Sequence, residues 1–278
     1  MFGPFKSCQG ILRLLEIIFS ALALIMVIFR DRMVSPWGVW CEFVWVFCII
    51  VPLVLIVMEA KSWHILLAAF LPNWADLCCG LTMLCAVMIS SASVIFAVVF
   101  VCGSCIVSIL CVIFSLVATV VFLVDAVRQK MACPSGYLSR LRGLLRMSEA
   151  FIACIILTAA TDYFVVYARS SFGMICSIIV FAVCLLVTVV IIVVHLLKLL
   201  QALLPFGLSM MEFVFNIVAV LLYLLAITLW IVFGYKRYRY NSYGCEYCSY
   251  ADYITVVVGA IVNLVLYIVD LVLSFKSR

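Results

Sequence analysis

Charged side chains are scarce in this sequence. Only 10% of its 278 residues are Asp, Glu, Lys or Arg, whereas 70% are hydrophobic. A soluble domain is closer to half apolar and a quarter charged, so this chain cannot build a water-soluble surface. The composition excludes a soluble enzyme and a disordered protein. The net charge is +5, but no long basic run is present, which excludes a nucleic-acid-binding domain. We expect the chain to reside in a lipid bilayer.

Motifs of catalysis are also missing. The sequence has 2 histidines, His64 and His195, and both lie in or beside apolar runs without a matching cysteine or carboxylate motif. No Walker loop, dinucleotide-binding fingerprint or HExxH zinc motif occurs. We therefore expect a protein that is not an enzyme and that uses no cofactor and no catalytic or structural metal.

The alternation of apolar and polar residues that marks barrel strands is absent, and prolines inside apolar runs are few. A membrane-spanning helix needs roughly 20 mostly apolar residues. The sequence predicts an all-α polytopic membrane protein whose eight spanning helices cover Ile11–Phe29, Gly38–Met58, Cys78–Phe100, Ser104–Val127, Leu144–Tyr167, Phe172–Leu197, Leu208–Phe233 and Tyr253–Phe275. Pro52 lies inside the second of these and is expected to kink it or to require other partners for the backbone.

An even number of spans places both termini on one side of the membrane. If that side is the cytosol, its segments hold Lys6, Arg13, Lys61, Arg128, Lys130, Arg140, Arg142, Arg146, Lys198, Lys276 and Arg278. The other side then holds Arg30, Arg32, Arg169, Lys236, Arg237 and Arg239. Positive residues favour cytosolic loops, so this excess predicts cytosolic termini, although the last three residues of the smaller set argue weakly the other way.

The sequence contains an internal repeat. Gly10–Glu16 (GILRLLE) matches Gly143–Glu149 (GLLRMSE), and Leu71-Pro72 before the third predicted helix matches Leu204-Pro205 before the seventh. Asp125 late in the fourth helix has a counterpart in Asp270 late in the eighth. These matches predict two parallel four-helix repeats, residues 1–130 and 143–278, joined by a basic cytosolic linker at residues 131–142.

Four-helix units with an Arg/Glu pair near the start of the first helix and an Asp late in the fourth resemble MARVEL domains. Two such units in tandem resemble the myeloid-associated differentiation marker family, most specifically in the segments GLLRMSEAFIACIIL and NLVLYIVDLV. The resemblance covers nearly the whole chain. It implies a non-enzymatic protein involved in membrane apposition, ordered lipid domains, trafficking or junctional organisation.

The charges inside the predicted spans are informative because each costs about 2.5–3.5 kcal/mol at a helix centre. Arg13 and Glu16 share a face of the first helix, as do Arg146 and Glu149 on the fifth. An acid near a helix C-terminus opposes the helix dipole and needs a cation. We therefore predict that each repeat is closed by an ionic clamp, with Arg13 pairing with Asp125 and Arg146 with Asp270.

An alternative for these acids is a proton or cation path. Transporters usually place such sites near the membrane midplane and on broken helices, whereas these acids lie near one membrane face, which favours the clamp. Only Asn216, Asn263 and the serines at positions 90, 91 and 93 give polarity deeper in the bilayer. Glu42 and Glu212 have no acidic counterpart in the other repeat, and the sequence does not assign them a role.

The third connection of each repeat contains one CxxC pair. The pair is Cys102 with Cys105 in the first repeat and Cys245 with Cys248 in the second. Each pair is a candidate disulfide, and simple packing at a tight helix junction is the alternative. The second of these connections, expected at Gly234–Asp252, is rich in tyrosine, which suits a membrane-interface belt or a contact surface for a partner. Cys8 and Cys133 near the cytosolic interface are candidate acylation sites.

These features together predict an integral multi-pass protein that organises lipid-ordered domains, membrane apposition or trafficking. The family resemblance implies that it lies in the plasma membrane. The expected partners are membrane lipids, either cholesterol-rich or anionic inner-leaflet lipid attracted by the basic stretch Arg128–Arg146, and other membrane proteins. The alternatives are a transporter or channel, which requires polar groups lining a path through the bilayer, and an accessory subunit of another membrane protein.

Overall fold

The computed structural model describes residues 8–30, 33, 35–63, 65, 74–101, 105–132, 137, 140–166, 171–196, 208–240 and 248–276. Of these it describes only the backbone at residues 30, 165, 166, 208, 235–240 and 248–250. This part of the chain is all helical and contains no strand.

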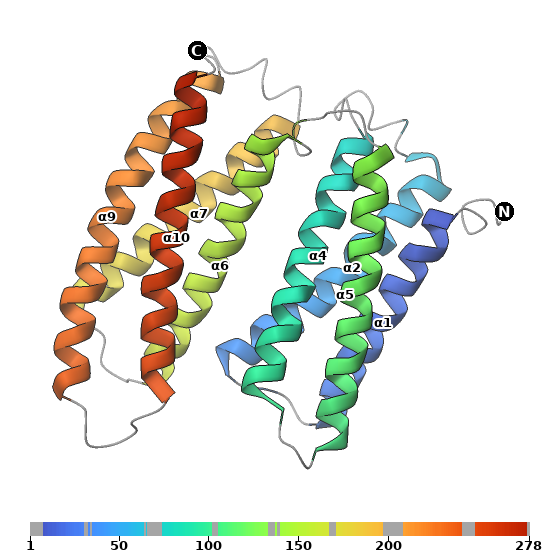
Figure 1. The fold of residues 1–278 in the computed structure, drawn as a ribbon, viewed down its shortest axis with the longest axis horizontal. Coiled ribbons are helices and arrows are strands. Elements are labelled where there is room, and N and C mark those ends of the chain that lie inside the picture. Colours follow the sequence, from blue (N-terminus) through green and yellow to red (C-terminus); the bar gives the residue numbers. More distant parts are fainter. Residues whose placement is uncertain are drawn as a thin grey trace. The chain divides into compact units, whose positions relative to one another are not determined.

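The chain divides into two compact units, Met1–Arg140 and Leu141–Arg278. Unit 1 contains α1 (Cys8–Arg30), α2 (Pro36–Ala60), α4 (Trp74–Val99) and α5 (Ile106–Ala132). Unit 2 contains α6 (Leu141–Val166), α7 (Phe172–Leu196), α9 (Leu208–Tyr240) and α10 (Cys248–Lys276). Figure 1 shows unit 1 in blue to green and unit 2 in yellow-green to red.

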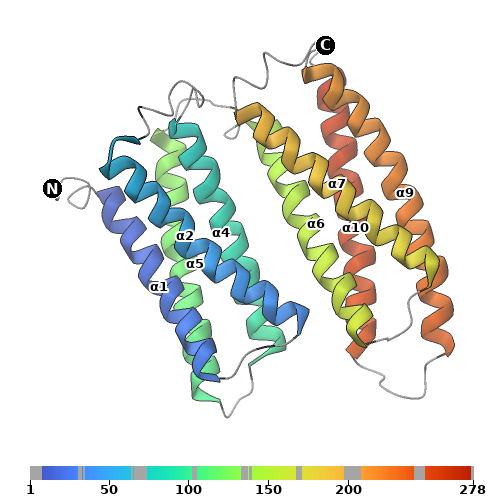
Figure 2. The same cartoon turned by 180° about the vertical axis from the view of Figure 1, so that it is seen from behind.

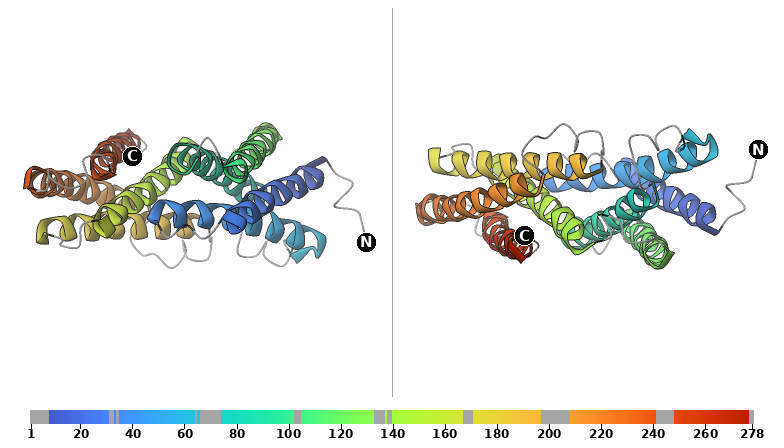
Figure 3. Two further views of the ribbon diagram at one scale, coloured as in Figure 1. Left: turned by 90° about the horizontal axis from the view of Figure 1, so that it is seen from below. Right: turned by 90° about the horizontal axis from the view of Figure 1, so that it is seen from above.

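Each of the eight helices is long and apolar enough to cross a membrane, so the predicted all-α, eight-span fold is confirmed. In unit 1, α1 and α4 each pack against both α2 and α5. In unit 2, α6 and α9 each pack against both α7 and α10. The second helix of each unit, α2 or α7, crosses its neighbours obliquely (Figure 2), and the end-on views in Figure 3 show the helices of each unit grouped side by side. The two units thus share one packing order.

Several helices extend beyond their predicted ends. α9 continues to Tyr240 and α10 begins at Cys248, so the connection expected at Gly234–Asp252 is much shorter. α5 ends at Ala132 and α6 begins at Leu141, so both ends of the predicted linker 131–142 are helical. Hydropathy marks where the apolar segment stops, whereas backbone hydrogen bonding continues through the polar residues that follow.

α2 shows how local sequence sets a helix. Ser35 precedes it in an extended conformation, and its Oγ accepts a hydrogen bond from the Gly38 backbone N–H at 3.2 Å. Pro36 occupies the first helical position, where a missing N–H is harmless. The helix then runs without a break to Ala60 with Pro52 buried inside it.

The distribution of side chains suits a lipid solvent. Large apolar residues are exposed along the helices, including Ile113, Leu116 and Val120 on α5 and Leu221 and Leu224 on α9. The interiors combine small residues with a few large aromatic ones, and arginines and carboxylates are buried among them. The polar side chains inside each unit are therefore the candidate site, since a buried charge in a membrane needs partners.

Candidate functional site: a duplicated polar cluster

Arg146 is the centre of a buried polar cluster in unit 2. Its Nη2 donates to Asn216 Oδ1 at 2.6 Å and lies 2.7 Å from Asp270 Oδ2, and its Nη1 donates to Glu149 Oε2 at 3.0 Å. The guanidinium carbon also lies 5.5 Å from the centroid of the Phe215 ring. The arginine is thus neutralised by acids from α6 and α10 and covered by an aromatic ring from α9.

A second arginine extends this cluster toward the surface. Arg142 Nη2 donates to Glu212 Oε2 at 3.0 Å and to Ser274 Oγ at 2.6 Å, and its Nε lies 3.6 Å from Asp270 Oδ1. Glu212 also binds His195 Nε2. All four helices of unit 2 therefore contribute to one polar network.

The corresponding cluster in unit 1 has different contacts. Arg13 Nη1 lies 2.5 Å from Glu59 Oε2, and Glu59 Oε1 also accepts a bond from Trp74 Nε1 at 3.4 Å. On the opposite side, Gln129 Nε2 donates to Asp125 Oδ2 at 2.6 Å. The same nitrogen donates to the Thr82 hydroxyl at 3.1 Å.

The predicted pairs of the ionic clamp have different outcomes. Arg146 and Asp270 are in direct contact, at 2.7 Å. Arg13 and Asp125 form no ion pair, and the prediction for that pair is wrong. The reason is that α2 extends past its expected end and brings Glu59 to Arg13, while Asp125 accepts a hydrogen bond from Gln129.

The two clusters occupy equivalent places in the repeat. Arg13 and Glu16 correspond to Arg146 and Glu149 at an offset of 133. Further correspondences join Thr82 with Asn216, Asp125 with Asp270 and Gln129 with Ser274. In both units the third helix contributes a neutral hydrogen-bonding residue and the fourth contributes an aspartate followed, one turn later, by another hydrogen-bonding residue.

The sequence analysis did not predict that Glu59 and Arg142 belong to these clusters, or that Glu212 pairs with Arg142 and His195. Glu59 lies one residue beyond the predicted end of its helix, and Glu212 was left without a role. Continuing the Leu71-Pro72 and Leu204-Pro205 match at its offset of 133 pairs Thr82 with Phe215, one residue before Asn216. The equivalence of Thr82 and Asn216 therefore rests on their contacts with Gln129 and Ser274. No sequence pattern predicts the ion pair between Arg13 and Glu59, because this pair depends on how α2 crosses α1.

Several deeper polar groups form hydrogen bonds within each unit. In unit 1, Trp45 Nε1 donates to Ser115 Oγ at 3.0 Å, and Ser115 Oγ lies 2.7 Å from Ser93 Oγ. Ser90 and Ser91 instead bond carbonyl oxygens of their own helix. In unit 2, Asn263 Nδ2 donates to the Tyr223 hydroxyl at 2.6 Å. These contacts join helices, as expected of small polar groups in a membrane interior.

The candidate cysteines are only partly described. Cys105 is half-buried, while Cys102 and Cys245 lie outside the described residues. Cys248 is the first residue of α10, and its side chain is not described. Both disulfides therefore stay predictions. Cys8 is exposed at the start of α1, where Arg128 Nη1 donates to its sulfur, and Cys133 lies outside the described residues.

The basic stretch is divided between the surface and the interior. Arg128, Lys130 and Arg140 are exposed. Arg146 is buried in its cluster, and Arg142 is partly buried against Glu212. Of these five residues, the first three therefore carry their charge at the surface.

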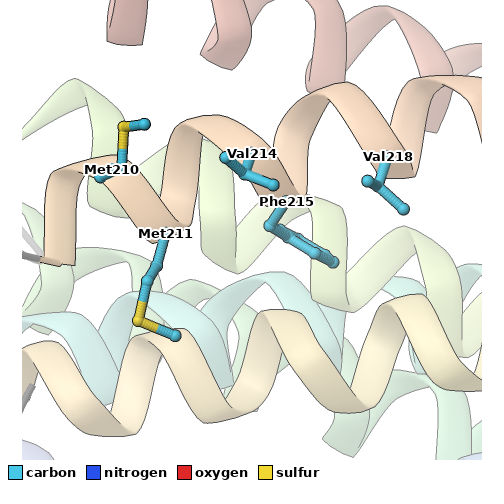
Figure 4. A pocket seen from close by; sticks show the side chains of 5 residues that line it. All are labelled: Met210, Met211, Val214, Phe215 and Val218. Carbon is cyan, nitrogen blue, oxygen red and sulfur yellow. The ribbon is translucent and has the colours of Figure 1, made fainter. Parts of the chain in front are cut away.

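A shallow apolar hollow of about 440 Å³ lies on α9 beside the unit 2 cluster. It is lined by Met210, Met211, Val214, Phe215 and Val218, which Figure 4 shows along one side of the helix. Phe215 thus contributes both to this hollow and to the cover of Arg146. Among the described residues, no group of three or more His, Cys, Asp or Glu side chains is arranged to hold a metal ion.

Known proteins resemble the chain over nearly its full length. It is 28% identical to a myeloid-associated differentiation marker homolog of Xenopus laevis, covering 98% of this chain and 93% of the relative. It is 27% identical to the myeloid-associated differentiation marker-like protein 2 of Mus musculus, covering 99% and 94%. It is 26% identical to the myeloid-associated differentiation marker of Pongo abelii, covering 95% and 86%.

No family profile matches the chain, and no solved structure matches it. The relatives nevertheless agree with the family that the internal repeat indicated, and they extend across both four-helix units. The chain is an integral multi-pass membrane protein that is similar over nearly its whole length to the myeloid-associated differentiation marker proteins.

Proposed function

We propose that the chain is a non-enzymatic organiser of lipid-ordered domains in the plasma membrane, with both termini in the cytosol, that acts in membrane apposition or trafficking. Its partners are membrane lipids and other membrane proteins. The names of its relatives describe differentiation markers rather than enzymes, which supports the non-enzymatic part of the proposal.

The length of the spans is the observation that carries the proposal. The spanning segments contain 22 to 27 residues. At about 1.5 Å per residue they are about 33 to 40 Å long, and a tilt of about 20° still leaves about 31 to 38 Å. The hydrocarbon core is about 27 Å thick in the endoplasmic reticulum and about 32–33 Å in sterol-rich plasma membrane. The spans are therefore long enough for the thicker membrane, which supports the proposal.

The lipid-facing surface supports the same conclusion. The exposed side chains of the spans are mainly large and apolar, while most of the buried arginines and acids gather at one end of each unit. A helical bundle with this apolar exterior selects its lipid surroundings by the length of its spans and by its lipid-facing side chains. It does not offer a polar path across the bilayer. Arg128, Lys130 and Arg140 add an exposed positive charge at the end that we assign to the cytosol, where anionic lipid would be attracted.

Partitioning in phase-separated giant vesicles derived from cells tests the proposal. A fluorescently tagged full chain should be enriched in the ordered phase, and removal of cholesterol should abolish that enrichment. Uniform distribution, or enrichment in the disordered phase, would contradict the proposal. In that case solute flux through reconstituted chain and stoichiometric co-purification in mild detergent would separate a transporter from an accessory subunit.

A further inference from the structure

The ion pair of Arg13 uses only one edge of its guanidinium group. Its Nη1 lies 2.5 Å from Glu59 Oε2, while its Nε and Nη2 are buried without a hydrogen-bond partner in the protein. These two nitrogens share an edge of the planar group, and their N–H bonds point the same way. One oxygen atom placed at this edge would accept from both.

Two further polar groups without partners follow Arg13 along α1. Glu16 Oε1 and the Ser20 hydroxyl are buried and form no hydrogen bond within the protein. Residues three and four apart are neighbours on a helix surface, so Arg13, Glu16 and Ser20 form one row. Each of the three is at most 1% exposed. Buried polar groups are normally hydrogen-bonded, so this row points to a bound species.

The mixture of donors and acceptors determines the chemistry of that species. Arg13 offers donors, Glu16 offers an acceptor, and the Ser20 hydroxyl can act as either. An anion would accept from Arg13 but would be repelled by the Glu16 and Glu59 carboxylates. A metal cation would bind oxygen atoms but would leave the N–H groups of Arg13 without an acceptor. Water both accepts and donates, and a buried water typically makes about three hydrogen bonds.

A small side chain opposite this row leaves room for water. α5 packs against α1, and Cys111 Sγ donates to the Ala23 carbonyl oxygen at 3.4 Å. The two helices run in opposite directions (Figure 1), so about two turns farther along, Ala118 on α5 lies at the level of Glu16. Ala118 is fully buried and presents only a methyl group.

We propose that unit 1 holds a buried water molecule that accepts from the Nε–Nη2 edge of Arg13, donates to Glu16 Oε1 and bonds the Ser20 hydroxyl. This site goes beyond the proposed function and does not depend on it.

Unit 2 offers only part of such a site. Glu149 Oε1 is also buried without a partner. Both Nη atoms of Arg146 are already bonded, however, by Glu149 at one and by Asn216 and Asp270 at the other. Ala153 occupies the position equivalent to Ser20 at the offset of 133, so the hydroxyl is missing as well. Arg146 is therefore the matched control for Arg13.

Solid-state NMR of the full chain in lipid bilayers, labelled with ¹⁵N at arginine, tests the site through magnetisation transfer from water to each guanidinium. Arg13 should receive magnetisation several-fold faster than Arg146, although each is 1% exposed. Arg13→Lys and Arg146→Lys identify the two signals by their loss. Ser20→Val should slow the transfer to Arg13 to the rate of Arg146, because the branched side chain removes the hydroxyl and fills the space of the water. Ala153→Val in unit 2 should leave the Arg13 rate unchanged.

Equal transfer rates for Arg13 and Arg146 in the wild type would overturn the proposal, and so would an Arg13 rate that Ser20→Val leaves unchanged. Replacing sodium by potassium, or chloride by sulfate, should not move the Arg13 signal. A shift in either exchange would show that an ion occupies the site, which also contradicts the proposal. Circular dichroism reports whether each variant keeps its helix content. If Ser20→Val fails to fold, the comparison of Arg13 with Arg146 in the wild type decides the question.

Discussion

Arg146 and Asp270 lie 2.7 Å apart and join the first turns of α6 to the last turns of α10. Their equivalents in unit 1, Arg13 and Asp125, form no such pair, because Glu59 has replaced the aspartate as the partner of the arginine. The same duplicated residues therefore close the two units through different helices: α6 and α10 in unit 2, but α1 and α2 in unit 1.

Replacement of Asp270 should destabilise the protein more than replacement of Asp125. In Asp270→Ala, the buried Arg146 loses one of its two carboxylate partners, and a broken buried pair typically costs about 3–5 kcal/mol of unfolding free energy. Asp125→Ala leaves the Arg13 ion pair intact and should cost less. Unfolding of the two variants, measured in the same micelles or by steric trapping in bilayers, compares them. Equal losses would contradict the difference between the units.

Glu59 should be coupled energetically to Arg13. Glu59 is about one-third exposed, with a side-chain exposure of 32%, so we expect Glu59→Gln to cost about 1–3 kcal/mol, the range for a hydrogen bond to a charged group. A double-mutant cycle with Arg13→Gln measures the pair directly. The double variant should lose clearly less than the sum of the single losses, and simple additivity would show that the contact contributes nothing.

Close packing of α7 and α9 should be sensitive to one methyl group. A Cβ atom at Gly173 would lie 2.2 Å from Cδ2 of Phe233, far inside normal contact distance. Gly173→Ala should therefore lower the unfolding free energy by about 1–3 kcal/mol, as overpacking does. Phe233→Leu, which removes the ring, should recover part of this loss when combined with it. If the losses of unfolding free energy in the two single variants simply add in the double variant, the strain does not arise from contact between residue 173 and the Phe233 ring.

The exposed cations should set the preference for anionic lipid. Neutralising Arg128 or Arg140 should lower the affinity for phosphatidylserine relative to phosphatidylcholine by about fivefold each, corresponding to about 1 kcal/mol per near-surface charge. The matched control is Arg142→Gln, whose charge is already paired with Glu212 at 3.0 Å. Lipid exchange in mixed nanodiscs measures the ratio. An equal effect of all three substitutions would contradict the separation of the basic stretch into exposed cations and cations paired inside the unit.

The number of helices, the duplicated plan and the Arg146–Asp270 contact could all be predicted from the sequence. Long apolar runs mark spans, and a repeated Arg/Glu pair with a repeated Asp marks equivalent places in two units. The partner of Arg13 could not be predicted, because it depends on the oblique crossing of α2 and on the helical turn that carries Glu59 beyond the apolar run. The extension of α9 to Tyr240 was missed for a related reason, since polar residues can continue a helix that hydropathy ends.

The central claim is that the spans fit a thick, sterol-rich plasma membrane. Unfolding of the full chain reconstituted in bilayers of graded hydrocarbon thickness tests it most directly. The account predicts greatest stability at a thickness of about 32–33 Å and a clear loss toward about 27 Å, because shorter cores leave the ends of the spans unmatched. Greatest stability at about 27 Å, or no dependence on thickness, would contradict the account.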